Sequence, residues 1–258
     1  MSIAVVTLSA ECARLAGLLR EALPDCRVYV HESVERSLDA EYFASVTELT
    51  ARIFDSHSGI IFIAPCGVAV RALAPLIRHK TTDPAVVVTD VLGRWAVSLL
   101  SGHERGANDL ALAVGNILCS EPVITTTTEA LKDLIVGVGC RRGTEAHKIV
   151  VAVQKTLQGA SLDLSRVRLL SSADLKSGER GLLDAAREMG IPLRFISSEE
   201  IRTCALEFEH SDFVNSKVDV PAVAEPAALL AGRRTQLIVR KTRHNGVIVA
   251  VARESSLL

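Results

Sequence analysis

A short polar loop, SGHERG at residues 101–106, contains residue types that could carry out acid-base chemistry. It follows the apolar run WAVSLL, which predicts a strand at residues 95–100, and it precedes a helix expected at residues 107–118. Loops at the carboxyl ends of strands are where open α/β sheets bind ligands. His103 lies between two glycines, which give a ligand room to approach, and an imidazole exchanges protons near neutral pH. This position makes His103 a candidate general base.

A structural interpretation of the same loop remains open. Asn108 or Asp109 would then cap the following helix, and His103 would only pack against its neighbours. The competing base in the loop is Glu104, whose neighbour Arg105 would tend to keep it ionised and poorly basic. The residues of the loop alone therefore allow both a catalytic and a structural role.

A second group of polar residues precedes this loop in the sequence. Arg71 lies in an apolar stretch expected to form a helix at residues 68–77, where an unpaired guanidinium is costly. It either pairs with a buried carboxylate or points at an anionic ligand, and the sequence does not decide between the two. Arg78, His79 and Lys80 follow near the expected end of that helix, where solvated cations compensate the helix dipole.

A glycine-rich octet, GVGCRRGT at residues 137–144, follows an apolar run and precedes another expected helix. Its glycines have the spacing G-x-G-x-x-x-G, one residue longer than the fingerprint of dinucleotide-binding proteins. Two guanidiniums, those of Arg141 and Arg142, lie beside the expected helix N-terminus and indicate an anionic partner. A dinucleotide-dependent oxidoreductase is therefore one candidate. Ion pairs between these arginines and carboxylates across a domain interface are a structural alternative.

The elements that would position these residues alternate between strands and helices, which predicts the α/β class. We expect two α/β layered domains, residues 1–128 and 129–258, each with a mostly parallel sheet flanked by helices. The boundary falls in a threonine-rich run after Pro122, and Asn245-Gly246 between two apolar runs predicts a final antiparallel hairpin. The expected strands are residues 3–6, 59–64, 85–90, 95–100, 134–139, 167–170 and 193–196. The expected helices are residues 11–22, 68–77, 107–118, 144–157 and 179–189.

Composition excludes several other classes of protein. The chain of 258 residues has a net charge of −1. Residues 1–130 contain 10 Lys and Arg against 15 Asp and Glu, and the remaining residues contain 19 Lys and Arg against 15 Asp and Glu. Neither part is therefore typical of a nucleic-acid binder. The start lacks a charged signal-peptide region and no apolar stretch is long enough to span a membrane, so we expect a cytoplasmic protein without a membrane partner.

The six cysteines form no C-x-x-C pair, which argues against a zinc site or a disulfide framework. Most should be small core residues.

Long motifs in a fixed order resemble the cobalt-precorrin-5A hydrolase family of anaerobic cobalamin biosynthesis, over most of residues 55–258. The runs GVAVRALAPL, KTTDPAVVVTD, LLSGHERGAN and PVITT are similar to the N-terminal domain of that family. The octet GVGCRRGT, the runs SSADLKSGERGLLDAA and SDFVNSKVDVPAVAEPAALL, and the final hairpin are similar to its C-terminal domain. The chain looks like a short form, because PVITTTTEALKDLIVGVGC joins the two domains where many members have a middle segment. Two positions also depart from the family pattern. The family more often has a smaller, less charged pair in place of Glu104-Arg105, and a glycine in place of Asp219.

The resemblance implies a hydrolase that opens the δ-lactone of cobalt-precorrin-5A and releases acetaldehyde to give cobalt-precorrin-5B. His103 would be the general base for water and later a proton donor, Asn108 would orient the site, and backbone amides around Gly106 and Ala107 would stabilise the oxyanion. The cobalt would arrive inside the substrate, so no cofactor or protein-bound metal is expected. The residues expected to bind the substrate are Arg71, Lys80, Ser101, Gly102, Gly106, Ala107, Gly139, Cys140, Arg141, Arg142, Gly143, Lys176, Glu179 and Glu225.

Other functions remain open beside this one. A non-catalytic corrinoid-binding carrier is the main alternative, and the missing middle segment favours it. The expected partner is a small-molecule cobalt-precorrin and no nucleic acid. The resemblance also leaves room for a homodimer and for hand-over of the corrinoid to other enzymes of the pathway.

Overall fold

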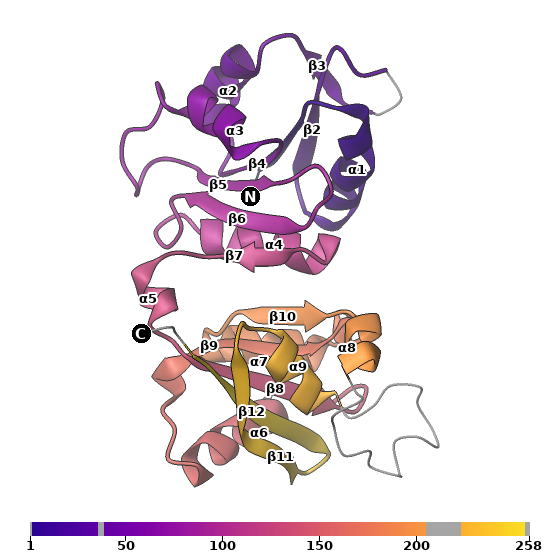
Figure 1. The fold of residues 1–258 in the computed structure, drawn as a ribbon, viewed down its shortest axis with the longest axis vertical. Helices are drawn as coiled ribbons and strands as arrows, with labels where there is room; N and C mark the ends of the chain where they lie inside the picture. Colours follow the sequence, from indigo (N-terminus) through magenta and orange to yellow (C-terminus); the bar gives the residue numbers. More distant parts are fainter. Residues whose placement is uncertain (1, 36–38, 205–222, 256–258) are drawn as a thin grey trace. The chain divides into compact units, whose positions relative to one another are not determined.

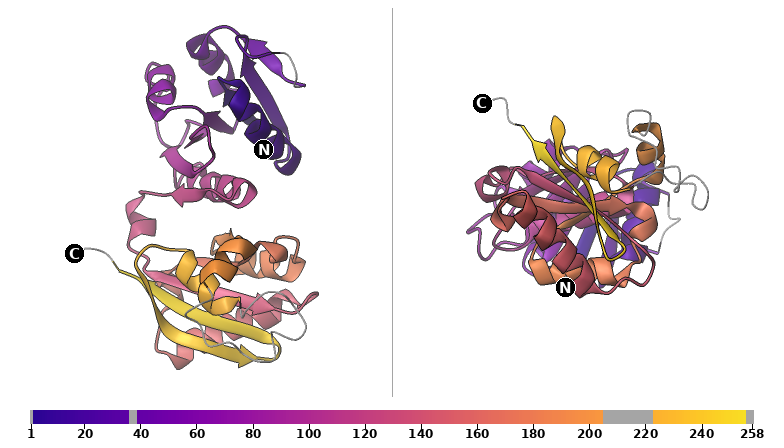
Figure 2. Two further views of the ribbon diagram at one scale, coloured as in Figure 1. Left: turned by 45° about the vertical axis from the view of Figure 1, so that its right-hand side comes forward. Right: turned by 90° about the horizontal axis from the view of Figure 1, so that it is seen from below.

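The chain is divided into two compact units, unit 1 at Met1–Thr126 and unit 2 at Thr127–Leu258, in the computed structural model (Figure 1). The structure describes residues 2–35, 39–204 and 223–255. Each unit has its own sheet, with helices on both faces (Figure 2). No helix within the described residues is both long and apolar enough to cross a membrane.

Unit 1 is built around a seven-stranded sheet with the strand order β3-β2-β1-β4-β5-β6-β7. The central strands are buried along their whole length, because helices cover both faces of a parallel sheet. Helices α1 and α4 pack on one face, and α2 and α3 pack on the other. The strands are β1 (Ile3–Thr7), β2 (Cys26–His31), β3 (Glu41–Phe43), β4 (Gly59–Ile63), β5 (Ala85–Thr89), β6 (Trp95–Leu100) and β7 (Glu121–Val123). The helices are α1 (Ala13–Ala22), α2 (Val46–Phe54), α3 (Cys66–Leu73) and α4 (Ala107–Leu118).

Strand β6 runs antiparallel to β5, and Leu100 at its end pairs with Val86 near the start of β5. The loop at residues 101–106 therefore lies at the edge of the sheet where β5 begins, opposite the carboxyl ends of β1, β4 and β5. The loop does follow the carboxyl end of a strand, as expected, but this strand is antiparallel to β5 and so ends at the other edge of the sheet. Residues 90–94 form a short hairpin connection, whereas a parallel crossover needs a dozen or more residues.

Unit 2 is built around a five-stranded sheet with the order β10-β9-β8-β12-β11. Strands β8, β9 and β10 are parallel, and β12 and β11 are antiparallel to their neighbours. The predicted fold class, two mostly parallel α/β sheets with a final antiparallel hairpin, is confirmed. The strands are β8 (Leu134–Cys140), β9 (Val167–Ala173), β10 (Leu193–Ile196), β11 (Thr235–His244) and β12 (Val247–Glu254). The helices are α5 (Thr127–Ala130), α6 (Ala146–Gly159), α7 (Arg180–Met189), α8 (Ser198–Cys204) and α9 (Ala224–Leu230).

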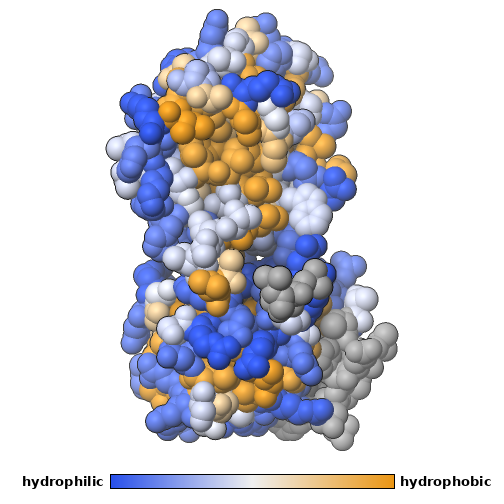
Figure 3. Space-filling view, turned by 60° about the vertical axis from the view of Figure 1, so that its left-hand side comes forward, coloured by the Kyte–Doolittle hydropathy of each residue, from blue (hydrophilic) through white to orange (hydrophobic). Residues whose placement is uncertain are grey.

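The surface of unit 1 carries exposed apolar side chains as well as charged ones. Figure 3 shows apolar residues gathered on the face of unit 1 that is turned to the viewer. The large apolar side chains that unit 1 exposes include Val70 of α3 and Ile77 after it, each 48% exposed. Contiguous apolar surface of this kind is typical of sites that bind apolar ligands or partners.

Candidate functional site

The loop at residues 101–106 is held in place by its own backbone. The carbonyl of Ser101 accepts hydrogen bonds from the amides of Arg105, at 3.2 Å, and Ala107, at 3.3 Å. Gly106 has a φ of 85°, a conformation that favours glycine, and it is the N-cap residue of α4 without any side-chain cap. Neither Asn108 nor Asp109 occupies the capping position, so the structural interpretation of these two residues is wrong.

Asn108 anchors the loop through a buried side chain. Its Oδ1 accepts a hydrogen bond from the Ser98 hydroxyl at 2.8 Å, and its Nδ2 donates one to Thr126 Oγ1 at 3.0 Å. Its backbone amide donates to the carbonyl of Gly102 at 3.0 Å. A Cβ on Gly102 would lie only 2.8 Å from Asn108 Oδ1, so this glycine is needed for the close approach. Asn108 is therefore placed to position the loop.

The hydroxyl of Ser101 is buried and has no hydrogen-bond partner among the described residues. Ser101 also has a φ of 60°, which is uncommon for a residue with a side chain. Orphaned polar groups and strained backbone of this kind concentrate at functional sites. Two backbone amides, those of Gly106 and Ala107, were expected to bind an oxyanion. The Ala107 amide already donates a hydrogen bond to the Ser101 carbonyl, whereas the Gly106 amide has no backbone acceptor within the described residues.

His103 and Glu104 are both exposed at the tip of the loop. Lys80, from the connection between α3 and β5, forms an ion pair with Glu104 at 2.5 Å. The hydrogen bond from Lys80 holds the pKa of Glu104 below its ordinary value, with a smaller contribution from nearby His103. Lys80, and not Arg105 as expected, is the cation that keeps Glu104 ionised. The structure thus brings Lys80 and the 101–106 loop together.

Arg71 lies elsewhere on unit 1. It is exposed on α3 and folds back over the first turn of its helix, with its guanidinium 3.5 Å from the position of a Cβ on Gly67. It forms no ion pair with any described residue, so of the two alternatives the structure does not support pairing with a buried carboxylate. Helix α3 begins at the carboxyl end of β4, at the sheet edge opposite the 101–106 loop. The structure does not bring Arg71 and His103 together.

Helix α3 ends at Leu73, earlier than expected, because the proline at position 75 has no amide to donate and disfavours helix in the residue before it. Arg78, His79 and Lys80 therefore do not compensate the end of a helix. The guanidinium of Arg78 pairs with Asp55 and lies 5.7 Å from the centroid of the Phe54 ring.

In unit 2, the first glycines of the octet belong to a strand and not to a loop. Gly137 and Gly139 lie within β8 and pair with Ala250 and Ile248 of β12. A Cβ on Gly137 would lie 1.8 Å from the carbonyl oxygen of Ala224 in α9. Gly137 is therefore explained by close packing of backbone on backbone. This removes the structural basis for a dinucleotide-binding loop at this place.

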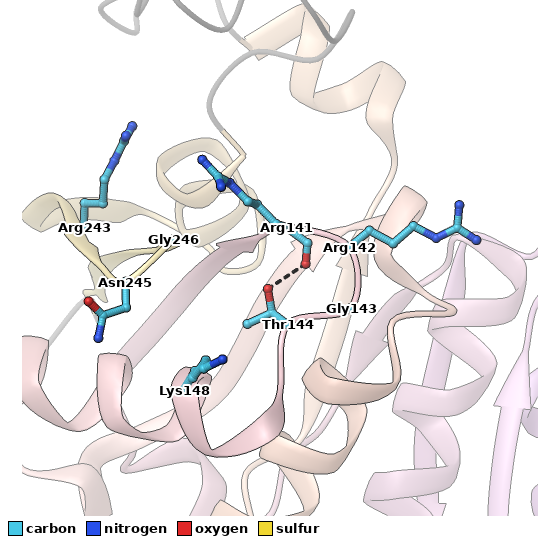
Figure 4. Close-up of a pocket in the computed structure, with 8 residues that line it drawn as sticks. All are labelled: Arg141, Arg142, Gly143, Thr144, Lys148, Arg243, Asn245 and Gly246. Carbon is cyan, nitrogen blue, oxygen red and sulfur yellow. Dashed lines mark hydrogen bonds between the residues drawn. The ribbon is translucent and has the colours of Figure 1, made fainter.

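The turn after β8 lines a pocket of about 330 Å³ within unit 2 (Figure 4). Three elements contribute: the turn itself, the first turns of α6 and the tip of the β11–β12 hairpin. Arg141 and Arg142 point in different directions from the turn, and Arg142 points away from Lys148 and Arg243 (Figure 4). Sequence analysis did not identify Lys148 or Arg243, which supply the other two cations. The lining residues are Arg141, Arg142, Gly143, Thr144, Lys148, Arg243, Asn245 and Gly246.

Two carboxylates, those of half-buried Glu179 and buried Glu225, hold parts of unit 2 together. Glu179 Oε1 accepts a hydrogen bond from the amide of Gly143 at 2.8 Å, and Lys176 lies 3.9 Å from its other oxygen. Glu225 accepts one from the amide of Lys241 at 2.9 Å, where the pairing of β11 with β12 shifts in register. Glu179 thus fixes Gly143 in the wall of the pocket, and Glu225 fixes the backbone of β11 two residues before Arg243. Most of the motif that precedes Glu225, with Asp219, lies outside the described residues.

The cysteines differ from the expectation of small core residues. Of those whose side chains are described, only Cys12 is buried, and Cys66 and Cys119 are exposed. Burial raises the pKa of the Cys140 thiol, and the groups that oppose this shift are Lys176 and Thr144. Burial also raises the pKa of Cys26 to about 11. No three His, Cys, Asp or Glu side chains in the described ranges lie together as a metal site.

These differences predict the order in which the thiols react with iodoacetamide near neutral pH. Cys66 and Cys119 should be modified first, because they are accessible, and Cys26 and Cys140 at least about tenfold more slowly, because the thiolate is the nucleophile. Peptide mass spectrometry over a time course measures this order. Rapid modification of Cys140 would show instead an activated thiol beside the pocket.

Two family models match the chain in sequence order. The model described as Cobalamin synthesis G N-terminal matches residues 48–129, and Cobalamin synthesis G C-terminus matches residues 134–252. A cobalt-precorrin-5A hydrolase from Priestia megaterium is 25% identical over 352 residues, which cover 96% of this chain and 94% of the relative. A probable cobalt-precorrin-5A hydrolase from Methanocaldococcus jannaschii is 33% identical over 309 residues, which cover 88% of this chain and 95% of the relative.

A solved structure is also similar to part of the chain. The match to the crystal structure of CobE, a protein from the cobalamin (vitamin B12) biosynthetic pathway, covers 47% of this chain and 90% of the CobE chain, with 27% identity and a TM-score of 0.44.

The alignments with both hydrolases are longer than the 258 residues of this chain, so the relatives contain residues that it lacks. The two family models leave only residues 130–133 between them. This agrees with the expected short connection between the domains.

Proposed function

The chain belongs to the cobalamin synthesis G family, and from this premise we propose that it hydrolyses the δ-lactone of cobalt-precorrin-5A, releasing acetaldehyde and leaving cobalt-precorrin-5B. The observation that carries the proposal is its similarity over nearly full length to proteins named as cobalt-precorrin-5A hydrolases. The exposed imidazole and the orphaned hydroxyl of the 101–106 loop support it. The experiment is an assay of acetaldehyde release from the lactone substrate.

In the proposed reaction, His103 takes a proton from the water that attacks the lactone carbonyl carbon. Negative charge develops on the carbonyl oxygen, and the Ser101 hydroxyl and the Gly106 amide are two donors of this loop that have no partner within the described residues. The ring C–O bond then breaks, giving a carboxylate and an alcohol. Asn108 acts as a positioning residue, because both polar atoms of its side chain bind the protein.

The second stage releases the two-carbon fragment. The alcohol gives its proton to solvent and becomes the carbonyl of acetaldehyde, while the bond between the fragment and the macrocycle breaks and its electron pair stays on the macrocycle. That carbon must then be protonated, and the imidazolium of His103 is the proton donor in this proposal. Water is consumed once, and no oxidant or reductant is required. The cobalt enters and leaves as part of the substrate.

Unit 2 would bind the acidic side chains of the corrinoid. The four cations around the pocket support this role, since guanidinium and ammonium groups are the usual partners of carboxylates. The domain boundary after residue 128, the cytoplasmic location, a homodimer and hand-over of the product remain predictions.

Changing both arginines of the turn, Arg141→Ala with Arg142→Ala, should raise the KM of the lactone substrate on the order of tenfold and leave kcat close to the parent value. The reason is that binding of remote carboxylates stabilises substrate and transition state equally. Steady-state kinetics separate the two constants, and added salt should mimic part of the effect. Arg187→Ala on α7 is the matched control. An unchanged KM with only a lower Tm would assign the arginines a structural role.

A corrinoid carrier is the second candidate, because the chain lacks residues that the relatives contain. A carrier would bind the lactone stoichiometrically without releasing acetaldehyde. The oxidoreductase is disfavoured, since Gly137 and Gly139 lie within β8.

A further inference from the structure

A second cavity, of about 220 Å³, shares part of its wall with the pocket beside the Arg141 turn. Lys148, Arg243 and Asn245 line both cavities, which therefore lie next to each other between α6 and the hairpin tip and are treated together as one groove. We call this the basic groove. The second cavity is lined by His147, Lys148, Val151, Ala152, Lys155, Arg243, His244 and Asn245.

The basic groove carries positive charge that the described residues leave largely uncompensated. Glu145 is the carboxylate beside it, 3.4 Å from both Lys148 and His147. The cations of the groove that form no ion pair with a described residue are Arg141, Arg142, Lys155 and Arg243. Several like charges in one groove repel one another unless anions neutralise them, so the groove is suited to a ligand with more than one anionic group.

The walls of the groove are fixed before any ligand binds. Thr156 of α6 has its hydroxyl 2.8 Å from Thr242 Oγ1 and 3.1 Å from His244 Nε2, so the end of β11 is joined to the helix. Asn245 and Gly246 have φ values of 48° and 87°, as in the tight two-residue turn of a hairpin. The backbone that carries Arg243, a residue lining both cavities, is therefore held in place by the hairpin and α6.

We infer that the basic groove binds two carboxylates of one ligand, one in each cavity, with Arg243 shared between them. The identity of the ligand rests on the proposed function: it is a cobalt corrinoid with free acidic side chains. Cavities of about 330 and 220 Å³ are suited to these side chains and not to the macrocycle itself. The lining offers no Phe, Tyr or Trp on which nucleic-acid bases could stack, which favours a small carboxylate ligand over nucleic acid.

The test is equilibrium dialysis of the full-length protein against cobyrinic acid, read by corrin absorbance, with the fully methyl-esterified macrocycle as the uncharged probe. Arg141→Gln, in the first cavity, and Lys155→Gln, in the second, should each weaken binding of the acid about 3- to 5-fold, the usual effect of one exposed charge pair. Arg243→Gln should weaken it on the order of 10-fold, because this side chain lines both cavities. Binding of the ester should not change in any variant.

Arg187→Gln is the matched control, because this α7 arginine pairs with Asp184 away from the groove. It should bind the acid like the parent protein, and all variants should keep the parent Tm. Equal binding of the acid by the parent and the three groove variants would overturn the inference. Tighter binding of citrate, inorganic phosphate or duplex DNA than of cobyrinic acid would also overturn it.

The failure of this inference can be told apart from the failure of the proposed function. If the groove variants weaken binding of the acid but the protein releases no acetaldehyde from the lactone, the groove inference is supported and the proposed hydrolase activity is contradicted. If the protein releases acetaldehyde but the groove variants bind the acid like the parent, the activity is supported and the groove inference is contradicted.

Discussion

Replacing His103 with glutamine is expected to lower turnover of the lactone substrate by roughly 10²- to 10⁴-fold, the usual contribution of a positioned acid-base group. The fold should be unaffected, because His103 is exposed at the tip of a loop that Asn108 and Gly106 hold in place. Corrinoid binding should also persist. Steady-state acetaldehyde release and equilibrium dialysis measure the two properties separately.

The structure makes His103 distinct among the described histidines. It forms no hydrogen bond or ion pair with a described residue, whereas each of the others has such a partner. His210 lies outside the described residues. The partnered histidines are His31, His57, His79, His147 and His244.

Glu104→Gln is the control for this prediction. Lys80 lowers the pKa of Glu104, so the carboxylate is a weak base, and the variant should keep turnover close to that of the parent. A His103→Gln protein with parental turnover, together with an inactive Glu104→Gln protein, would transfer the role of general base to Glu104.

Replacing Gly137 with alanine is expected to destabilise unit 2 by about 3 kcal/mol or more, at the upper end of the usual cost of overpacking. The added Cβ would lie 1.8 Å from the carbonyl oxygen of Ala224, so the backbones of β8 and α9 would have to separate. Denaturant unfolding followed by circular dichroism, with limited proteolysis to show which unit opens, measures the loss.

Gly159→Ala provides the matched control in the same unit, since a Cβ there meets nothing within 4 Å at the end of α6. It should be neutral or stabilise unit 2 by up to about 1 kcal/mol, because alanine loses less backbone entropy in a helix. If Gly137→Ala unfolds at the same denaturant concentration as the parent, the glycine is not needed for packing. A phosphate-binding role for the octet would then regain support.

Much of the fold follows from local sequence patterns. Strand β6 and helix α4 begin and end where the apolar run and the helical period predict, and the Asn-Gly pair gives the final hairpin. Helix α2 was not predicted, although Ser45 followed by Glu48 is a capping signal, and Ser45 Oγ does accept a hydrogen bond from the Glu48 amide. The antiparallel direction of β6 follows from its short connection to β5, which is too short for a parallel crossover.

The candidate site was predictable only where its residues are close in sequence. Ser101, His103 and Asn108 lie in one short loop, so a single motif identifies them. The pairing of Lys80 with Glu104 depends on how two distant connections meet at one edge of a sheet. Arg243 joins the turn after β8 because β12 pairs directly with β8, an arrangement that local patterns do not specify.

The most direct test of the proposed activity is to incubate the purified protein with a large molar excess of cobalt-precorrin-5A and to quantify acetaldehyde and the lactone-free macrocycle together. The account predicts equal amounts of the two products, formed over many turnovers for each protein molecule. Binding of the lactone substrate without acetaldehyde release, by protein that is folded and corrinoid-saturated, would contradict it and identify the chain as a carrier.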